Sequence, residues 1–187
     1  LYKFQKINSS YKFIEGFHLY QKYSRKDVFR IMNWAQNPVA QNVGGYLVSP
    51  DNSHCPIFVN YHKEEHISES TKYEDEFVNN KEFDWMSKSN RKINSNDVQS
   101  ILGKKGAIRL PLFIKKNNDE GMDFYYMGEV SPKLDLVEQT TMSNDKGKQI
   151  SVVKIRFNLG NPVTATMYNY LQEKGPVEVA KSKKKTN

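Results

Sequence analysis

Cysteine is nearly absent from this sequence, since Cys55 is the only one among 187 residues. A single thiol excludes a disulfide-bonded scaffold and a zinc site built from cysteines. Sparse cysteine is typical of a reducing compartment, so we expect a cytoplasmic location. Cys55 lies beside Pro56 in an apolar segment, which favours a packed core residue over a nucleophile.

Long hydrophobic runs are also missing. No segment approaches the roughly 20 apolar residues that cross a bilayer, and no signal peptide is visible, so we expect no membrane partner. The first residue is Leu1 rather than Met, which predicts a processed product or a piece of a longer protein. The length suits one domain. We expect an N-terminal extension or linker over 1–20, one α+β recognition domain over 21–175 and a basic disordered tail over 176–187.

Most catalytic signatures are lacking as well. The sequence has no G-x-x-x-x-G-K-[ST] phosphate loop, no G-x-G-x-x-G and no G-x-S-x-G nucleophile elbow. One pattern, His62-x-x-Glu65-His66, matches the H-x-x-E-H zinc motif, and a zinc hydrolase is therefore a third hypothesis. That motif needs both histidines on one helix face, and the flanking residues favour a loop. We expect no enzyme activity, no cofactor and no metal.

Positive charge is present in excess but unevenly distributed. The net charge is +7, and four lysines of the tail contribute to it. Residues 64–82 hold seven acids and two bases, whereas residues 84–116 hold eight bases and two acids. If the fold gathers the second group on one face, that face would attract phosphates. A solvated surface of mixed sign is the alternative.

The pattern of apolar residues predicts few helices and several strands. Ser24 and Asp27 form a capping box for a helix that ends at Asn37-Pro38. Further helices are expected over 94–102, closed by Gly103, and after Asn161-Pro162. Strands are expected over 46–48, 55–61, 108–114, 124–130 and 153–159, with a hairpin turn at 117–121 and a long polar loop over 131–149. We predict an α+β fold with a curved, mostly antiparallel sheet or small β-barrel, PUA-like by analogy.

Residues 69–92 concentrate large aromatics, hydroxyls and cations, although they show no clean helix or strand period. Aromatic faces can stack on bases and cations can hold phosphates, so this block indicates nucleic-acid binding. Two of its aromatics, Phe77 and Phe83, have no polar atom and are better candidates for the core. Trp85 and Tyr73 suit the walls of a pocket.

Six phrases in fixed order resemble a known family: 23–28, 55–63, 70–77, 83–89, 112–116 and 124–130. They are similar to an uncharacterised domain at the C-terminal end of DEAD/DEAH-type helicases of bacterial restriction and phage-defence systems, which often also carry a phospholipase-D-type nuclease. The chain departs from many members at Met86 and Lys88, where they have glutamines. The resemblance implies helicase and nuclease domains as partners, and a role in selecting the target.

The first hypothesis is therefore a non-catalytic DNA-binding module that reads plain or modified DNA, altered in base or backbone, through an aromatic-lined pocket. Trp85 and Tyr73 would be the stacking walls, Ser87 and Ser89 would bond a base edge or a phosphate, and cations would hold the backbone. The expected nucleic-acid-binding residues are Arg25, Tyr46, Tyr61, Lys63, Lys72, Tyr73, Trp85, Ser87, Lys88, Ser89, Arg91 and Lys92. The alternative is a protein-interaction domain that docks the helicase onto a nuclease.

Overall fold

Seven strands form one curled sheet, in the order β4-β7-β8-β9-β6-β5 with β3 paired to β8. The computed structural model describes residues 12–39, 43–62, 75–144 and 146–173. Only β4 and β7 are parallel, and the other pairs are antiparallel. Within the described residues the strands are β1 (Phe13–Ile14), β2 (Phe17–His18), β3 (Lys22–Tyr23), β4 (Ile57–Asn60), β5 (Glu76–Asn79), β6 (Glu82–Met86), β7 (Pro111–Lys115), β8 (Phe124–Ser143) and β9 (Gln149–Leu159).

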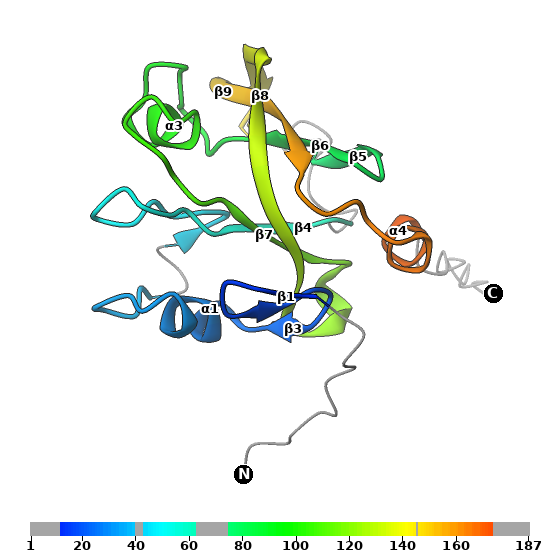
Figure 1. Cartoon of the computed structure of the whole chain (residues 1–187). Coiled ribbons are helices and arrows are strands. Elements are labelled where there is room, and N and C mark those ends of the chain that lie inside the picture. Colours follow the sequence, from blue (N-terminus) through cyan, green and yellow to red (C-terminus); the bar gives the residue numbers. More distant parts are fainter. Residues whose placement is uncertain (1–11, 40–42, 63–74, 145, 174–187) are drawn as a thin grey trace, which may run out of the picture.

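Three short α-helices and one 3₁₀ turn, η2 (Asn118–Glu120), complete the described part of the fold. The helices are α1 (Arg25–Ile31), α3 (Asn96–Ile101) and α4 (Ala165–Gln172), and Figure 1 shows them around the sheet. The expected α+β architecture with a curved, mostly antiparallel sheet is confirmed. Among these described segments no helix has the length and apolar content needed to cross a bilayer.

The sheet curls into a half-barrel because its two edge strands approach each other. Tyr61, directly after β4, lies with its ring centroid 5.6 Å from that of Phe77 on β5. The Phe77 backbone N–H also donates to the Tyr61 hydroxyl at 3.5 Å. The strand β8 makes the curl possible, because its first half pairs with β3 and β7 and its second half pairs with β9 (Figure 1).

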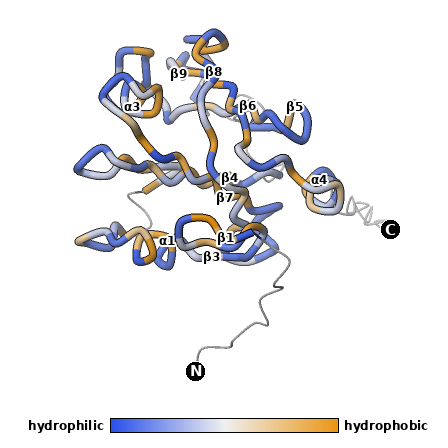
Figure 2. The backbone as a smooth tube through the Cα atoms, in the orientation of Figure 1, coloured by the Kyte–Doolittle hydropathy of each residue, from blue (hydrophilic) through white to orange (hydrophobic). Residues whose placement is uncertain are grey.

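The core lies inside this curl. Phe113 on β7 stacks on Phe58 of β4 at 5.3 Å between ring centroids, and Phe157 on β9 packs against Trp85 of β6. In Figure 2 hydrophobic stretches follow the central strands, whereas the turn between β5 and β6 is hydrophilic. Phe17 is fully buried, so the packed chain extends before the expected start of the domain at residue 21. The expected tail lies outside the described residues.

Several expected elements are confirmed. Ser24 and Asp27 form the expected capping box of α1, in which the Asp27 backbone N–H donates to Ser24 Oγ and the Ser24 N–H donates to Asp27. The helix nevertheless ends six residues early, because Asn33 adopts a left-handed φ of 57°. Helix α3, the β7–β8 hairpin and the alternation of β9 are also as expected.

Four expectations are wrong. The segment 131–149 is largely strand rather than loop, since β8 continues to Ser143 and pairs with β9 as an exposed ribbon. The block 73–92, which shows no period, contains β5 and β6. The segment 46–48 contributes only a single bridge, between Tyr46 and Ile57. Helix α4 begins after Thr164 instead of at Asn161-Pro162, because the Thr164 side chain accepts the bond from Met167 N–H.

Candidate nucleic-acid interface

Two adjoining cavities lie beside the end of β6. The larger, of about 820 Å³, lies between the loop 47–52 and α3, and the smaller, of about 490 Å³, lies between β4 and β6. Both are lined by Tyr46, Lys88 and Arg91, and we call the pair the Lys88 cleft. Volumes of this size are in the range of ligand sites in proteins.

Lys88 stands where the two cavities meet. Its backbone N–H donates to the Tyr46 hydroxyl at 3.4 Å, and its Nζ lies 4.6 Å from the centroid of the Tyr46 ring. Gly44 has a φ of 59°, and a Cβ there would come within 3.2 Å of Lys88 Cε, so glycine leaves room for this side chain. Burial, and then the charge of Arg91, lower the pKa of Lys88. The amine forms no ion pair with a described carboxylate.

Arg91, Asp97 and Tyr46 form a saturated network on one wall of the cleft. Arg91 Nε and the Tyr46 hydroxyl both donate to Asp97 Oδ2, at 2.7 and 2.8 Å. Burial alone would raise the pKa of Asp97, but the hydrogen bonds from Arg91 and Tyr46 hold it below its usual value. Burial, followed by the charge of Asp97, raises the pKa of Tyr46 far above its ordinary range. The network therefore fixes the position of Arg91 and leaves its charge largely neutralised.

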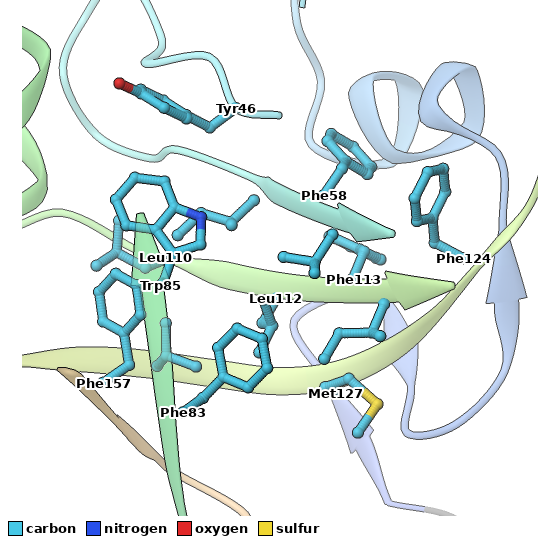
Figure 3. Close-up of a cluster of buried hydrophobic side chains, with 14 of the residues drawn as sticks. Tyr46, Phe58, Phe83, Trp85, Leu110, Leu112, Phe113, Phe124, Met127 and Phe157 are labelled. Atoms are coloured by element: carbon cyan, nitrogen blue, oxygen red, sulfur yellow. The ribbon is translucent and has the colours of Figure 1, made fainter. Parts of the chain in front are cut away.

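Trp85 is the clearest correction to the expected site. Trp85 lines the smaller cavity, but its side chain is only 2% exposed, so in this conformation its ring face is not open to a stacking base. Figure 3 shows the indole between Tyr46 and Phe157, with centroid distances of 5.1 and 5.5 Å. Tyr46, the expected further wall, is also 2% exposed. Both aromatics belong to the packed core and also line the cleft, and composition alone does not distinguish such residues from an open stacking surface.

Ser87 is likewise a structural residue. It is 1% exposed, its Oγ accepts from the Val153 N–H at 2.9 Å, and the hydroxyl donates to the Lys88 carbonyl at 3.1 Å. Ser87 lines the smaller cavity, but the bonds that extend β6 toward β9 occupy its hydroxyl, so in this conformation the hydroxyl is not available to a base edge or a phosphate. Ser89 lines the smaller cavity, and its carbonyl accepts a bond from Arg91.

The other expected residues are spread over the molecule. Lys92 is exposed beside the cleft, and Tyr61 lies between the sheet edges, where its hydroxyl accepts from Gln172 at 2.6 Å. Arg25 lies apart, on the rings of Phe58 and Phe124. The last group, Lys63, Lys72 and Tyr73, lies outside the described residues.

Sequence reasoning missed two polar members of the cleft. Asp97 and Lys105 both line the larger cavity, and the Lys105 amine donates to the Asn96 side chain. Lys105 belongs to the basic segment 84–116, and that excess of positive charge was the one signal that could have found it. The pairing of Asp97 with Tyr46 spans 51 residues, so no local pattern reveals it.

The described residues offer no evident catalytic group in the cleft. The Cys55 thiol is fully buried, and burial raises its pKa well above the ordinary value, which disfavours the nucleophilic thiolate. No cluster of three metal-ligating side chains occurs in the described ranges. His62 Nε2 lies 2.7 Å from the Leu171 carbonyl oxygen, whereas Glu65 and His66 lie outside these ranges. The arrangement is suited to holding an anion.

Comparison with known proteins identifies the family. No protein of curated function matches the chain. A crystal structure of Arabidopsis thaliana SUVH6 in complex with SAM aligns with a TM-score of 0.45 at 12% identity, over 87% of this chain and 30% of that chain. This likeness is too low to support an argument, and the chain spans less than a third of that protein. Residues 17–171 match the family described as a domain of unknown function (DUF3427), and the chain belongs to that family.

Proposed function

We propose that this chain is a non-catalytic nucleic-acid-recognition module that holds DNA by its phosphates at the Lys88 cleft. The proposal depends on one observation above all: the Lys88 amine stands between two cavities with no carboxylate partner among the described residues. The charge of Asp97 acts on this amine without forming an ion pair with it, and a partly desolvated amine without an ion pair favours binding of an anion. Lys105 adds positive charge on the same cleft.

The resemblance to the C-terminal domain of restriction and defence helicases supports a place for the module in such a system. There it would bring the helicase and nuclease to their target in the cytoplasm. Discrimination between plain and modified DNA would come from the fit of an altered base or backbone in the smaller cavity, between β4 and β6. Because Trp85 and Ser87 are buried, we assign this fit to the cleft surface formed by Lys88, Ser89 and Arg91.

The test is a fluorescence-anisotropy titration of the whole chain with three duplexes of one sequence: plain, 5-methylcytosine-substituted and phosphorothioate-linked. Titrations at 50 and 200 mM salt measure the phosphate contacts. With about three contacts, affinity should fall on the order of 40-fold over that range. If affinity does not change with salt, the chain does not bind DNA through its phosphates. If all three duplexes bind with equal affinity, the chain does not distinguish modified from plain DNA.

Two variants that each remove one positive charge test whether the duplex binds at the Lys88 cleft. Lys88→Gln should reduce the slope of log affinity against log salt by about 1. Lys81→Gln is the matched control, because Lys81 is exposed at the turn that begins β6, about 20 Å from Lys88 along an extended chain. Equal effects of the two substitutions would show that the cleft is not the site.

A docking function is the second candidate, and one surface favours it. Leu134 and Leu136 of β8 are 54% and 43% exposed, where pairing with β9 is interrupted between Pro132 and Val137. Exposed apolar residues on a protruding ribbon are typical of protein contacts. If this ribbon docks a nuclease subunit, Leu134→Ser with Leu136→Ser should abolish co-purification with that subunit and leave DNA affinity intact. Loss of DNA affinity with recruitment intact would contradict docking.

A further inference from the structure

The guanidinium of Arg25 lies over the rings of two phenylalanines, Phe58 and Phe124. Its Cζ is 5.3 Å from the ring centroid of Phe58 and 4.8 Å from that of Phe124. Nε is buried and has no hydrogen-bond acceptor. Arg25 forms no hydrogen bond to the described residues, so the five N–H donors of this half-buried side chain lack an acceptor in that part of the chain.

Lys115 approaches the same rings from β7. Its Nζ lies 5.2 Å from the centroid of Phe124 and donates to the Gly121 carbonyl at 3.2 Å. Both cations lie over the ring of Phe124, and burial, followed by the charge of Arg25, lowers the pKa of Lys115. The carboxylate that acts on Lys115 is Glu120, and it already accepts a bond from the Lys116 backbone N–H.

Neither cation has an ion pair among the described side chains. Two like charges held over one aromatic surface repel each other, and burial weakens their hydration. An anion placed between them would relieve the repulsion and supply acceptors for the guanidinium. A phosphate suits this geometry, because its oxygens can accept from the planar fork of arginine and from a lysine amine at once.

We infer that Arg25 and Lys115 form a second phosphate-binding subsite, which holds a phosphodiester of the nucleic acid bound at the Lys88 cleft. The inference rests on the proposed function, since it names a further contact with the same ligand. Phe58 links the two places: this residue of β4 lines the smaller cavity of the cleft, and its ring carries the Arg25 guanidinium. A strand leaving the cleft across β4 would therefore meet Arg25 and Lys115.

The salt dependence of duplex affinity measures whether Arg25 and Lys115 contact phosphates. Arg25→Gln and Lys115→Gln should each reduce the slope of log affinity against log salt by about 1, and the double variant by about 2. Arg25→Lys keeps the charge and should keep the slope. Lys26→Gln is the matched control, because Lys26 is the exposed neighbour of Arg25 on α1 and loses the same charge. Equal slopes for Arg25→Gln, Lys26→Gln and the wild type would overturn the subsite.

A second measurement does not depend on the folding of a variant. In the ¹⁵N-labelled wild-type chain, the Arg25 Nε–H resonance, assigned by its loss in Arg25→Lys, should shift on titration with a plain 12-base-pair duplex. An unshifted Arg25 resonance, together with a reduced slope for Lys88→Gln, would overturn the subsite and leave the proposed function standing. A shift with inorganic phosphate alone, and no duplex binding, would overturn the nucleic-acid ligand and the proposed function together.

Discussion

The block around Trp85 and the pair Arg25–Lys115 differ in whether their polar groups are already satisfied. Trp85 is 2% exposed, and Ser87 bonds both the Val153 N–H and the Lys88 carbonyl. Arg25, in contrast, covers Phe58 and Phe124 with donors that have no acceptor among the described residues. Both regions combine aromatics with cations, but Trp85 and Ser87 are fully engaged within the protein, whereas Arg25 and Lys115, like Lys88, form no ion pair with the described carboxylates. Residue types alone therefore do not locate a binding surface, whereas unused hydrogen-bonding and charge capacity does.

The largest expected effect is a loss of stability when Trp85 is replaced, which would show that this ring serves the core. Because the indole packs against Tyr46 and Phe157, Trp85→Ala should lower the free energy of unfolding by about 3–5 kcal/mol. Urea unfolding at pH 7 measures it. If the free energy of unfolding falls by less than about 1 kcal/mol and duplex affinity is lost, Trp85 would be a binding residue rather than a core residue.

Ser87 should behave in the same way with a smaller effect. Ser87→Ala leaves the buried Val153 N–H without its acceptor, so we expect a loss of about 1–3 kcal/mol in unfolding free energy and no change in duplex affinity. Ser89→Ala, measured by the same unfolding and titration experiments, is the comparison, because Ser89 is more exposed. Weakened binding by Ser87→Ala at full stability would contradict the structural role.

The network of Arg91, Asp97 and Tyr46 predicts that the free energy of unfolding depends on pH. Hydrogen bonds from Arg91 and Tyr46 hold the folded pKa of Asp97 below its unfolded value, despite the opposing effect of burial. The resulting stabilisation is fully present above the unfolded pKa, about 3.9, and is lost as the pH falls through the lower folded pKa. Asp97→Asn should cost about 1–2 kcal/mol at pH 7 and make the loss of stability between pH 5 and 3 smaller.

Unfolding curves from pH 7 to 3 measure this dependence. Asp119→Asn is the control, because Asp119 lies exposed in η2 and its carboxylate has no ion pair with the described cations. The same acid response in the wild type and in Asp97→Asn would show that the network does not stabilise the fold through Asp97.

The smallest expected effect is spectroscopic. The chain has two tryptophans, so Trp34→Phe leaves Trp85 as the sole indole. Saturation with duplex should leave the emission of Trp85 and its quenching by acrylamide unchanged, because the ring is sealed in the core (Figure 3). Strong quenching by the duplex would mean that a base reaches the indole.

Local patterns predicted the parts of the fold that local physics determines. The capping box at Ser24 and Asp27, the turn after β7 and the alternation of β9 are all encoded within a few residues. The second half of β8 could not be predicted, because its side chains are mostly polar and exposed and its strand conformation depends on pairing with β9.

The candidate site was predictable only in part. The basic segment 84–116 contains Lys88, Arg91 and Lys105 of the cleft, and also Lys115. The burial of Trp85 depends on Phe157, 72 positions along the chain, and the partners of Arg25 come from β4 and β8. Contacts between distant segments leave no periodic signal, so aromatic and cationic residues could be counted but not assigned to core or surface.

One combined variant tests most directly whether these cations, rather than the aromatic block, bind the duplex. The measurement is the slope of log duplex affinity against log salt. Arg25→Gln, Lys88→Gln, Lys105→Gln and Lys115→Gln together should remove most of the slope of log duplex affinity against log salt, with the fold intact by circular dichroism. A slope equal to that of the wild type would contradict the assignment of DNA binding to these residues.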